Sequence, residues 1–237
     1  MDKNITKARA YFYEFLAYPL FFHTSDEKFA RWREQLSYLA QNPLSEQSAE
    51  AFANLEKFSF KELVNEQNEV LFGFTNIPLS ASFYEEGRDN GAARLRVIHC
   101  LNLSPYRRDK ELCKDSEDYV GFIFLAMATF LNDEFNGAKN ISDKLFSETL
   151  NLFVDEFGSL LLAHKNANFF RSYALILKDF IELERAVLSV EAPAKPQGDS
   201  VAMAALKKEP FQSKMPTIKT KLHWEEFSPV ISHEFKD

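Results

Sequence analysis

Glycine and cysteine are scarce in this chain, and no hydrophobic run is long enough to span a bilayer. Only 7 of the 237 residues are glycine, which argues against a turn-rich β fold. The two cysteines, Cys100 and Cys113, stand in neither a metal-binding nor a redox spacing. We therefore expect two buried free thiols, as in a reducing compartment. Residues 1–9 lack the apolar core of a signal peptide, so we expect a cytoplasmic protein.

Sequence motifs for catalysis, metal binding and phosphate binding are also missing. Neither glycine pattern that cradles phosphate occurs, and none of the five histidines stands in a Glu-x-x-His or His-x-x-x-His spacing. We therefore expect no enzyme, with no catalytic residues, no metal and no cofactor. A helical enzyme or nucleotide-binding protein with an unrecognised site is the alternative interpretation.

The charge is acidic and unevenly distributed. A net charge of −7 disfavours nucleic acid and anionic membranes as partners and is compatible with a basic peptide. Residues 191–237 contain seven lysines and seven acidic residues, so residues 1–190 carry the whole net charge. The pair Arg107-Arg108 has no apolar segment after it, and we interpret it as a surface pair rather than an export signal.

Apolar residues recur at helical spacing through most of residues 5–188. With an apolar fraction of 46% and 24 phenylalanines, this predicts an all-α fold, with residues 1–190 forming a single globular bundle of about eight to ten helices. Ser59 with Glu62 is a capping-box pattern that predicts a helix start. Residues 74–84 have no helical period and contain turn residues, so we expect an ordered loop there.

The composition changes after Val190. Five of the nine prolines fall in the last 48 residues, together with a run of lysines, which predicts a largely irregular Pro/Lys-rich C-terminal extension over residues 191–237. Trp224, Phe227 and Ile231 follow the basic stretch and could anchor this extension on the acidic body. One interpretation is therefore that it covers a binding groove until a ligand displaces it. The other is a disordered extension.

Residues 115–131 predict a central helix. Asp115, Ser116, Glu117 and Asp118 precede thirteen residues without charge. Asp115 or Ser116 can cap the first amides, and the next two carboxylates suit the positive end of the helix dipole. The remainder has no polar face, which predicts burial on nearly all sides, and it is too short to span a bilayer, which takes about 20 residues.

Three short patterns occur in order along the chain. They are Leu71-Phe72 at the end of a predicted helix, Pro78, Ser82 and Tyr84 in the following loop, and Asp115-Ser116-Glu117-Asp118-Tyr119-Val120 at the start of the central helix. Their order, spacing and helical setting resemble the TorD/DmsD/NarJ family of redox-enzyme maturation chaperones over residues 5–188. The chain departs from the family pattern at Leu79 and Ser80, which replace a proline and an aromatic residue. Ser116 replaces a further proline and Tyr119 a histidine.

The resemblance implies a cytoplasmic, system-specific chaperone for a molybdenum-containing oxidoreductase, such as formate dehydrogenase or a DMSO/TMAO-type reductase. It would bind the twin-arginine signal peptide of the apo catalytic subunit, delay export, and assist cofactor insertion and assembly. It would be a monomer or homodimer, without nucleic acid and without stable membrane insertion. A helical adaptor that binds folded protein is a further alternative.

Such a peptide presents two guanidinium groups followed by an apolar helix, so its site needs carboxylates beside an apolar groove. Arginine–carboxylate pairs can be bidentate, and apolar burial contributes about 25 cal/mol per Å². We expect the apolar contacts to set most of the affinity and the carboxylates to set the register. The candidate peptide-binding residues are Leu71, Phe72, Pro78, Ser82, Tyr84, Glu117, Asp118 and Tyr119. The plainer interpretation of these residues is helix capping and core packing.

Overall fold

The computed structural model describes residues 3–23, 25–73, 76–194 and 197–207, and these ranges are mostly helical. The helices are α1 (Lys3–Ala17), the 3₁₀ turn η1 (Tyr18–Leu20), α2 (Glu27–Leu39), α3 (Glu46–Leu55), α4 (Phe60–Val70), α5 (Ala81–Glu86), α6 (Ala92–Asn102), α7 (Val120–Phe135), α8 (Ser142–Leu145), the π-helical turn η2 (Phe146–Leu150), α9 (Asn151–Ala163), α10 (Phe169–Leu188) and α11 (Val201–Leu206). The β pairing within the described ranges is one isolated bridge, between Ser80 and Tyr119. The predicted all-α fold is confirmed.

Contacts divide the chain into two units, Met1–Leu206 and Lys207–Asp237. The first unit contains all the helices named above, including the short α11 beyond residue 190. One interpretation of the C-terminal extension is that it covers a groove, and it concerns mostly residues 208–237. These residues lie outside the described part of the chain, so that interpretation stays a prediction.

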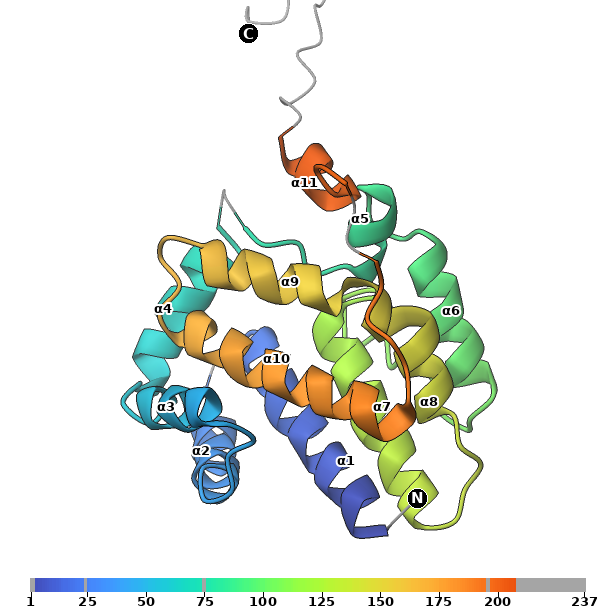
Figure 1. Ribbon diagram of the computed structural model, residues 1–237, viewed down its shortest axis with the longest axis horizontal. Coiled ribbons are helices and arrows are strands. Elements are labelled where there is room, and N and C mark those ends of the chain that lie inside the picture. The colour runs from blue at the N-terminus through green and yellow to red at the C-terminus, as the bar shows by residue number, and fades with distance from the viewer. Residues whose placement is uncertain (1–2, 24, 74–75, 195–196, 208–237) are drawn as a thin grey trace, which may run out of the picture. The chain divides into compact units, whose positions relative to one another are not determined.

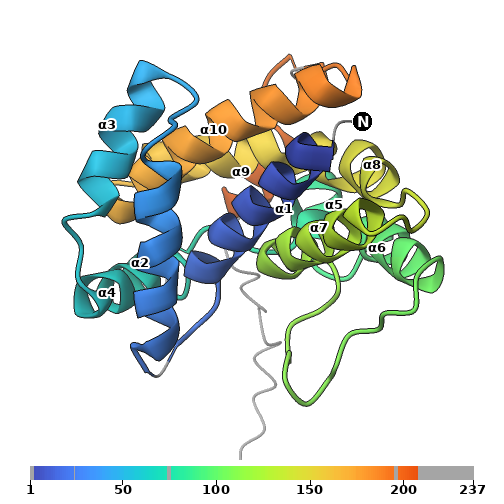
Figure 2. The same ribbon diagram turned by 90° about the horizontal axis from the view of Figure 1, so that it is seen from below.

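Helices α1 and α7 lie side by side through the middle of the first unit (Figure 2). Helix α10 packs against α3 and α9, while α5 and α6 lie on the flank away from α2 and α3 (Figure 1). Most of α7 is buried, as its lack of a polar face predicts; Ile123, Phe124, Met127 and Leu131 are fully covered. The apolar run thus supplies the centre of the bundle.

Aromatic side chains fill the contact between α1, α2 and α10. Trp32 of α2 stacks on Phe15 of α1, with 5.2 Å between ring centroids, and lies 5.6 Å from the ring of Phe169 in α10. Its indole nitrogen donates to the carbonyl oxygen of Phe15 at 3.1 Å. The ring is therefore buried without leaving its polar atom unsatisfied.

A buried ion pair joins α1 to α10. Arg9 donates to the carboxylate of Glu184 from Nε at 2.6 Å and from Nη2 at 3.0 Å, and the hydroxyl of Tyr13 donates to the same carboxylate at 2.8 Å. Burial and the neighbouring Glu184 raise the pKa of Tyr13 well above its usual value. Bidentate pairing of this kind offsets the desolvation of both charges and fixes the register of the two helices.

Both cysteines are free. Cys100 is buried, as predicted, and burial raises the pKa of its thiol to about 11. Cys113 is only half-buried, so the prediction of two buried thiols is correct for Cys100 alone. Burial also raises the pKa of Cys113, so both thiols are protonated at neutral pH.

The predicted loop over residues 74–84 is wrong in its last four residues, because α5 begins at Ala81. Residues 76–79 are irregular, and 74–75 lie outside the described residues. A helix of six residues is shorter than the window in which a helical period becomes visible. It ends at Gly87, whose φ of +68° is the left-handed conformation that glycine adopts at low cost.

Two carboxylates of α4 serve as helix caps. The predicted Ser59–Glu62 capping box is confirmed: the amide of Ser59 donates to Glu62 at 2.8 Å, and the amide of Glu62 donates to the hydroxyl of Ser59 at 3.3 Å. One turn later, the buried carboxylate of Glu66 accepts the amides of Asn168, Phe169 and Phe170 at 2.8–2.9 Å. Glu66 therefore fixes the start of α10 against α4.

Replacing Glu66 by alanine should lower the free energy of unfolding by about 2 kcal/mol, because three amides at a buried helix start lose their acceptor. Glu69, an exposed residue of the same helix, is the matched control, and Glu69→Ala should change stability by less than about 0.5 kcal/mol. Urea denaturation followed by circular dichroism measures both. Equal stability of the two variants would contradict the capping role.

Candidate functional site

Two segments far apart in the sequence meet through their main chains. The amide of Ala81 donates to the carbonyl oxygen of Asp118 at 2.8 Å, and the amide of Val120 donates to Leu79 at 2.8 Å. Together with the bridge between Ser80 and Tyr119, these bonds join the start of α5 to the start of α7. The second and third patterns of the sequence analysis are therefore neighbours in space.

Asp118 is the buried anchor of this junction. Its side chain is 0% exposed and accepts from the hydroxyl of Ser80 at 2.6 Å, from the amide of Ser82 at 3.3 Å, and from the hydroxyl of Ser116. Burial alone would raise the pKa of Asp118, but hydrogen bonds from Ser116, Ser80 and Ser82 outweigh burial and lower it. The carboxylate is therefore ionised and fully occupied within the protein.

The predicted start of the central helix is wrong. Helix α7 begins at Val120, and Tyr119 stands at its N-cap in an extended conformation without a side-chain capping bond. Asp115 and Ser116 do not cap it, and Asp118 precedes it. The physical reason is tertiary: the main chain around Tyr119 pairs with residues 79–81, and the carboxylate of Asp118 finds its donors there.

Glu117 lies between two arginines. It accepts from Nε of Arg94 at 2.6 Å and from Nε of Arg108 at 2.9 Å. Burial opposes ionisation of Glu117, but the hydrogen bonds from Arg94 and Arg108 outweigh it and lower the pKa of the carboxyl. Arg108 also donates to the carbonyl oxygens of Cys113 at 2.9 Å and Asp115 at 2.6 Å. The interpretation of Arg107-Arg108 as a surface pair is therefore wrong for Arg108, whose side chain is only 10% exposed.

The end of α4 is held beside residues 19–22. The side-chain amide of Gln67 donates to the carbonyl oxygens of Pro19 at 2.7 Å and Phe21 at 2.9 Å. Leu71, one turn later, is buried in the core. Phe72 is 45% exposed, and its ring lies 6.4 Å from that of Phe22. The first pattern thus presents one apolar side chain to the core and one to the surface.

All three patterns border one pocket of about 600 Å³. Of the eight predicted site residues, four line it, namely Leu71, Phe72, Pro78 and Tyr119. The other four, Ser82, Tyr84, Glu117 and Asp118, are buried outside its lining. They act as supports: the hydroxyl of Tyr84, for example, donates to the carbonyl oxygen of Pro78 at 2.8 Å.

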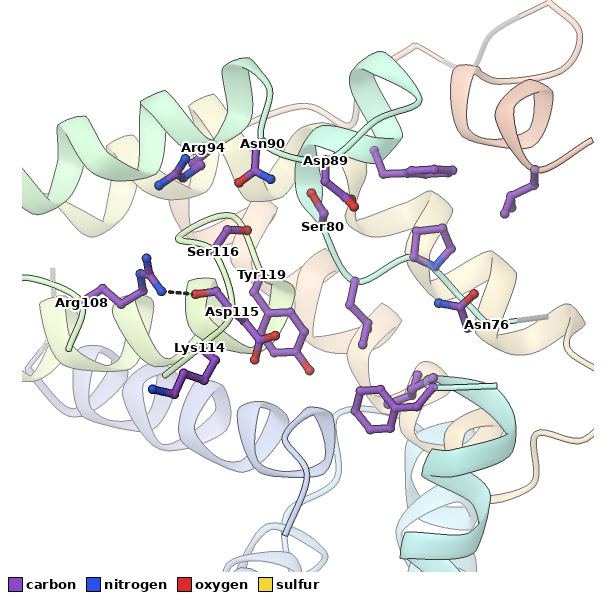
Figure 3. Close-up of a pocket in the computed structure, with 16 residues that line it drawn as sticks. Asn76, Ser80, Asp89, Asn90, Arg94, Arg108, Lys114, Asp115, Ser116 and Tyr119 are labelled. Atoms are coloured by element: carbon purple, nitrogen blue, oxygen red, sulfur yellow. Dashed lines mark hydrogen bonds between the residues drawn. The ribbon is translucent and has the colours of Figure 1, made fainter. Parts of the chain in front are cut away.

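Sequence reasoning did not assign the open charges of this pocket to the site. Asp89 and Asp115 line it and are exposed, and in the part of the chain that the structure describes neither carboxylate takes part in an ion pair. Figure 3 shows Asp89 and Asn90 beside the start of α6, and Lys114 and Asp115 across from them. Asp115 belongs to the acidic stretch of the sequence, whereas Asp89 had no signal of its own, because its position depends on the turn after α5.

The pocket combines an apolar lining with charged side chains at its rim. Phe72, Leu79 and Phe83 supply apolar surface, and the two open carboxylates lie at the rim. Of the three cations among its described lining residues, Arg94 and Arg108 share the single carboxylate of Glu117, and Lys114 is exposed. A ligand that combines positive charge with an apolar part matches this lining.

The sequence matches no protein-family model and no curated protein. Among the described residues, no group of three or more His, Cys, Asp and Glu side chains is arranged to hold a metal ion. Within the same ranges, no helix has both the length and the apolar character needed to cross a membrane.

The role of Asp118 predicts a specific pH dependence for Asp118→Asn. The pKa of Asp118 is lower in the folded protein than in the unfolded chain, so its contribution to stability is present above the unfolded value of about 3.9 and is lost as pH falls through the folded value. At pH 7 the variant should lose about 2 kcal/mol of unfolding free energy. Urea denaturation from pH 7 to pH 3 should show this difference shrinking below about pH 4. A difference that does not vary with pH would contradict the role.

Proposed function

We propose that this chain is a cytoplasmic chaperone of the TorD/DmsD/NarJ type. It binds the twin-arginine signal peptide of the apo form of a molybdenum-containing oxidoreductase, delays export, and assists cofactor insertion and assembly. The observation that carries the proposal is the convergence of three separate patterns: Leu71-Phe72, Pro78 of the following loop, and Asp115, Ser116 and Tyr119 all contribute to the lining of one pocket.

Recognition of the arginines is assigned to Asp89 and Asp115. A guanidinium group needs a carboxylate with open lone pairs, and Glu117 and Asp118 already have internal donors. Both rim carboxylates are exposed, so each pair with a peptide arginine is worth less than the roughly 1.5–3 kcal/mol of a buried charge-assisted bond. Glu117 and Asp118 then act as positioning residues that hold the pocket walls.

The alternative function, a nucleotide-binding protein or an enzyme, would use the cations of the same pocket. Two of these three cations share the carboxylate of Glu117, and the rim carboxylates of Asp89 and Asp115 balance the positive charge that remains. The pocket therefore has little excess positive charge to offer a phosphate group. The open carboxylates at the rim would repel an anionic ligand further. A thermal-shift experiment with ATP and GTP separates the two functions, since the chaperone proposal expects no stabilisation by either nucleotide.

Asp89→Asn and Asp115→Asn should each weaken binding of a synthetic twin-arginine leader peptide by about three- to tenfold, because an arginine loses a charged acceptor. Isothermal titration calorimetry at low salt measures the change. Glu111→Gln is the matched control: Glu111 is exposed and lies four positions before Asp115, but it does not line the pocket.

A leader with both arginines replaced by lysine should bind the wild-type protein more weakly, because lysine cannot form the bidentate pair. It should also discriminate less between wild type and Asp115→Asn. Unchanged affinity in both aspartate variants would remove the assignment of the arginines to this pocket. No binding of the leader to the wild-type protein would remove the proposed function.

A further inference from the structure

A second pocket, of about 540 Å³, borders the first and is mainly apolar. It is lined by aromatic and aliphatic side chains that include Phe21, Phe22, Trp32, Leu112, Phe122 and Leu125. Leu112 is 87% exposed, Phe22 56% and Leu125 40%. Large apolar side chains gathered at a concave surface are typical of a site that a partner covers.

The two pockets share a wall. Residues 112–113 line the apolar pocket, and residues 114–116 line the first one. The rings of Phe22 and Phe72, one from each pocket, lie 6.4 Å apart, and those of Phe21 and Tyr119 lie 5.4 Å apart. Phe22 and Phe72 are both exposed, so their rings form an aromatic bridge over which an extended ligand can pass from one pocket to the other.

Gly121 in the first turn of α7 keeps this boundary compact. A Cβ atom at this position would come within 2.9 Å of carbon atoms in the rings of Phe21 and Tyr119. Because glycine has no side chain, both rings pack closely over the start of the helix. The close packing of these two rings at the boundary between the pockets thus depends on the absence of a side chain at Gly121.

The charges of the two pockets differ. The first carries the open carboxylates Asp89 and Asp115 at its rim. Among the described residues that line the apolar pocket, Glu14 pairs with Arg31 at 3.4 Å and Lys28 is exposed, so this pocket has no open carboxylate and carries a net positive charge. A ligand lying across both pockets would therefore place its positive charge in the first and an uncharged, apolar segment in the second.

We propose that the apolar pocket is the second half of one binding site and that it takes the apolar segment that follows the arginines in the same leader peptide. This inference rests on the proposed function. It assigns the larger, hydrophobic share of the affinity to Phe22, Leu112 and Leu125, outside the pocket that the three sequence patterns surround. Pairing of the peptide arginines with Asp89 and Asp115 then sets the register of the peptide.

Leu112→Ser and Leu125→Ser test the inference, with Leu152→Ser as the matched control. Leu152 is 45% exposed on α9 and lines neither pocket. Two synthetic peptides are titrated by calorimetry: a complete leader, and a short one that ends after the arginine pair. Both pocket variants should bind the complete leader about tenfold more weakly, because apolar contact area is lost. They should bind the short peptide like wild type.

The outcomes separate the inference from the proposed function. One outcome is that Asp115→Asn weakens binding of the complete leader, whereas Leu112→Ser and Leu125→Ser bind it like wild type. In that case the apolar pocket does not bind the leader, while the proposed function stands. If wild-type protein binds neither peptide, the inference and the proposed function are both wrong. Sedimentation of the same variants provides a further check: conversion of a dimer to a monomer by either substitution would identify a second copy as the occupant and overturn the inference.

Discussion

The site depends on the buried carboxylate of Asp118. An ionised group without exposed surface is stable only with donors around it, and here these donors come from Ser80, Ser82 and Ser116. Satisfying one carboxylate therefore ties the start of α5 to the start of α7, two segments that are far apart in the sequence. Without this tie the main-chain bridge between residues 79–81 and 118–120 would have little to hold it, since a single isolated bridge is a weak element.

Burial divides the acidic stretch into carboxylates that are paired within the protein and a carboxylate that is exposed. Glu117 and Asp118 are neutralised within the protein, so pairing either of them with a ligand would require the internal donors to be replaced. Asp115 stands in the same stretch but is exposed, and it remains available. The four consecutive polar residues thus have different surroundings, because the chain turns between them. Under the proposed function, recognition of the ligand would therefore fall on Asp115 and not on the two buried carboxylates beside it.

The all-α fold and the buried central helix follow from the sequence because apolar periodicity is a local property. The Ser59–Glu62 capping box is equally local, and it is present as predicted. What could not be predicted depends on contacts between distant residues: α7 starts late because Asp118 finds its donors near Ser80, and Arg108 is covered because Glu117 pairs with it. Asp89 reaches the pocket through the turn that follows α5, a helix too short to show a period. The sequence could therefore indicate the region of the site, but not which of its residues are open to a ligand.

Arg108 links the buried carboxylate of Glu117 to the segment that lines both pockets. Its guanidinium is fixed by Glu117, the neighbour of Asp118, and it donates to the carbonyl oxygens of Cys113 and Asp115. Those two residues belong to the segment that lines the apolar pocket on one side and the charged pocket on the other. A buried arginine with main-chain acceptors can hold such a segment in place where few apolar contacts do. The distance between Asp115 at the charged pocket and Leu112 at the apolar pocket is therefore set inside the protein, by residues that the proposed ligand need not touch.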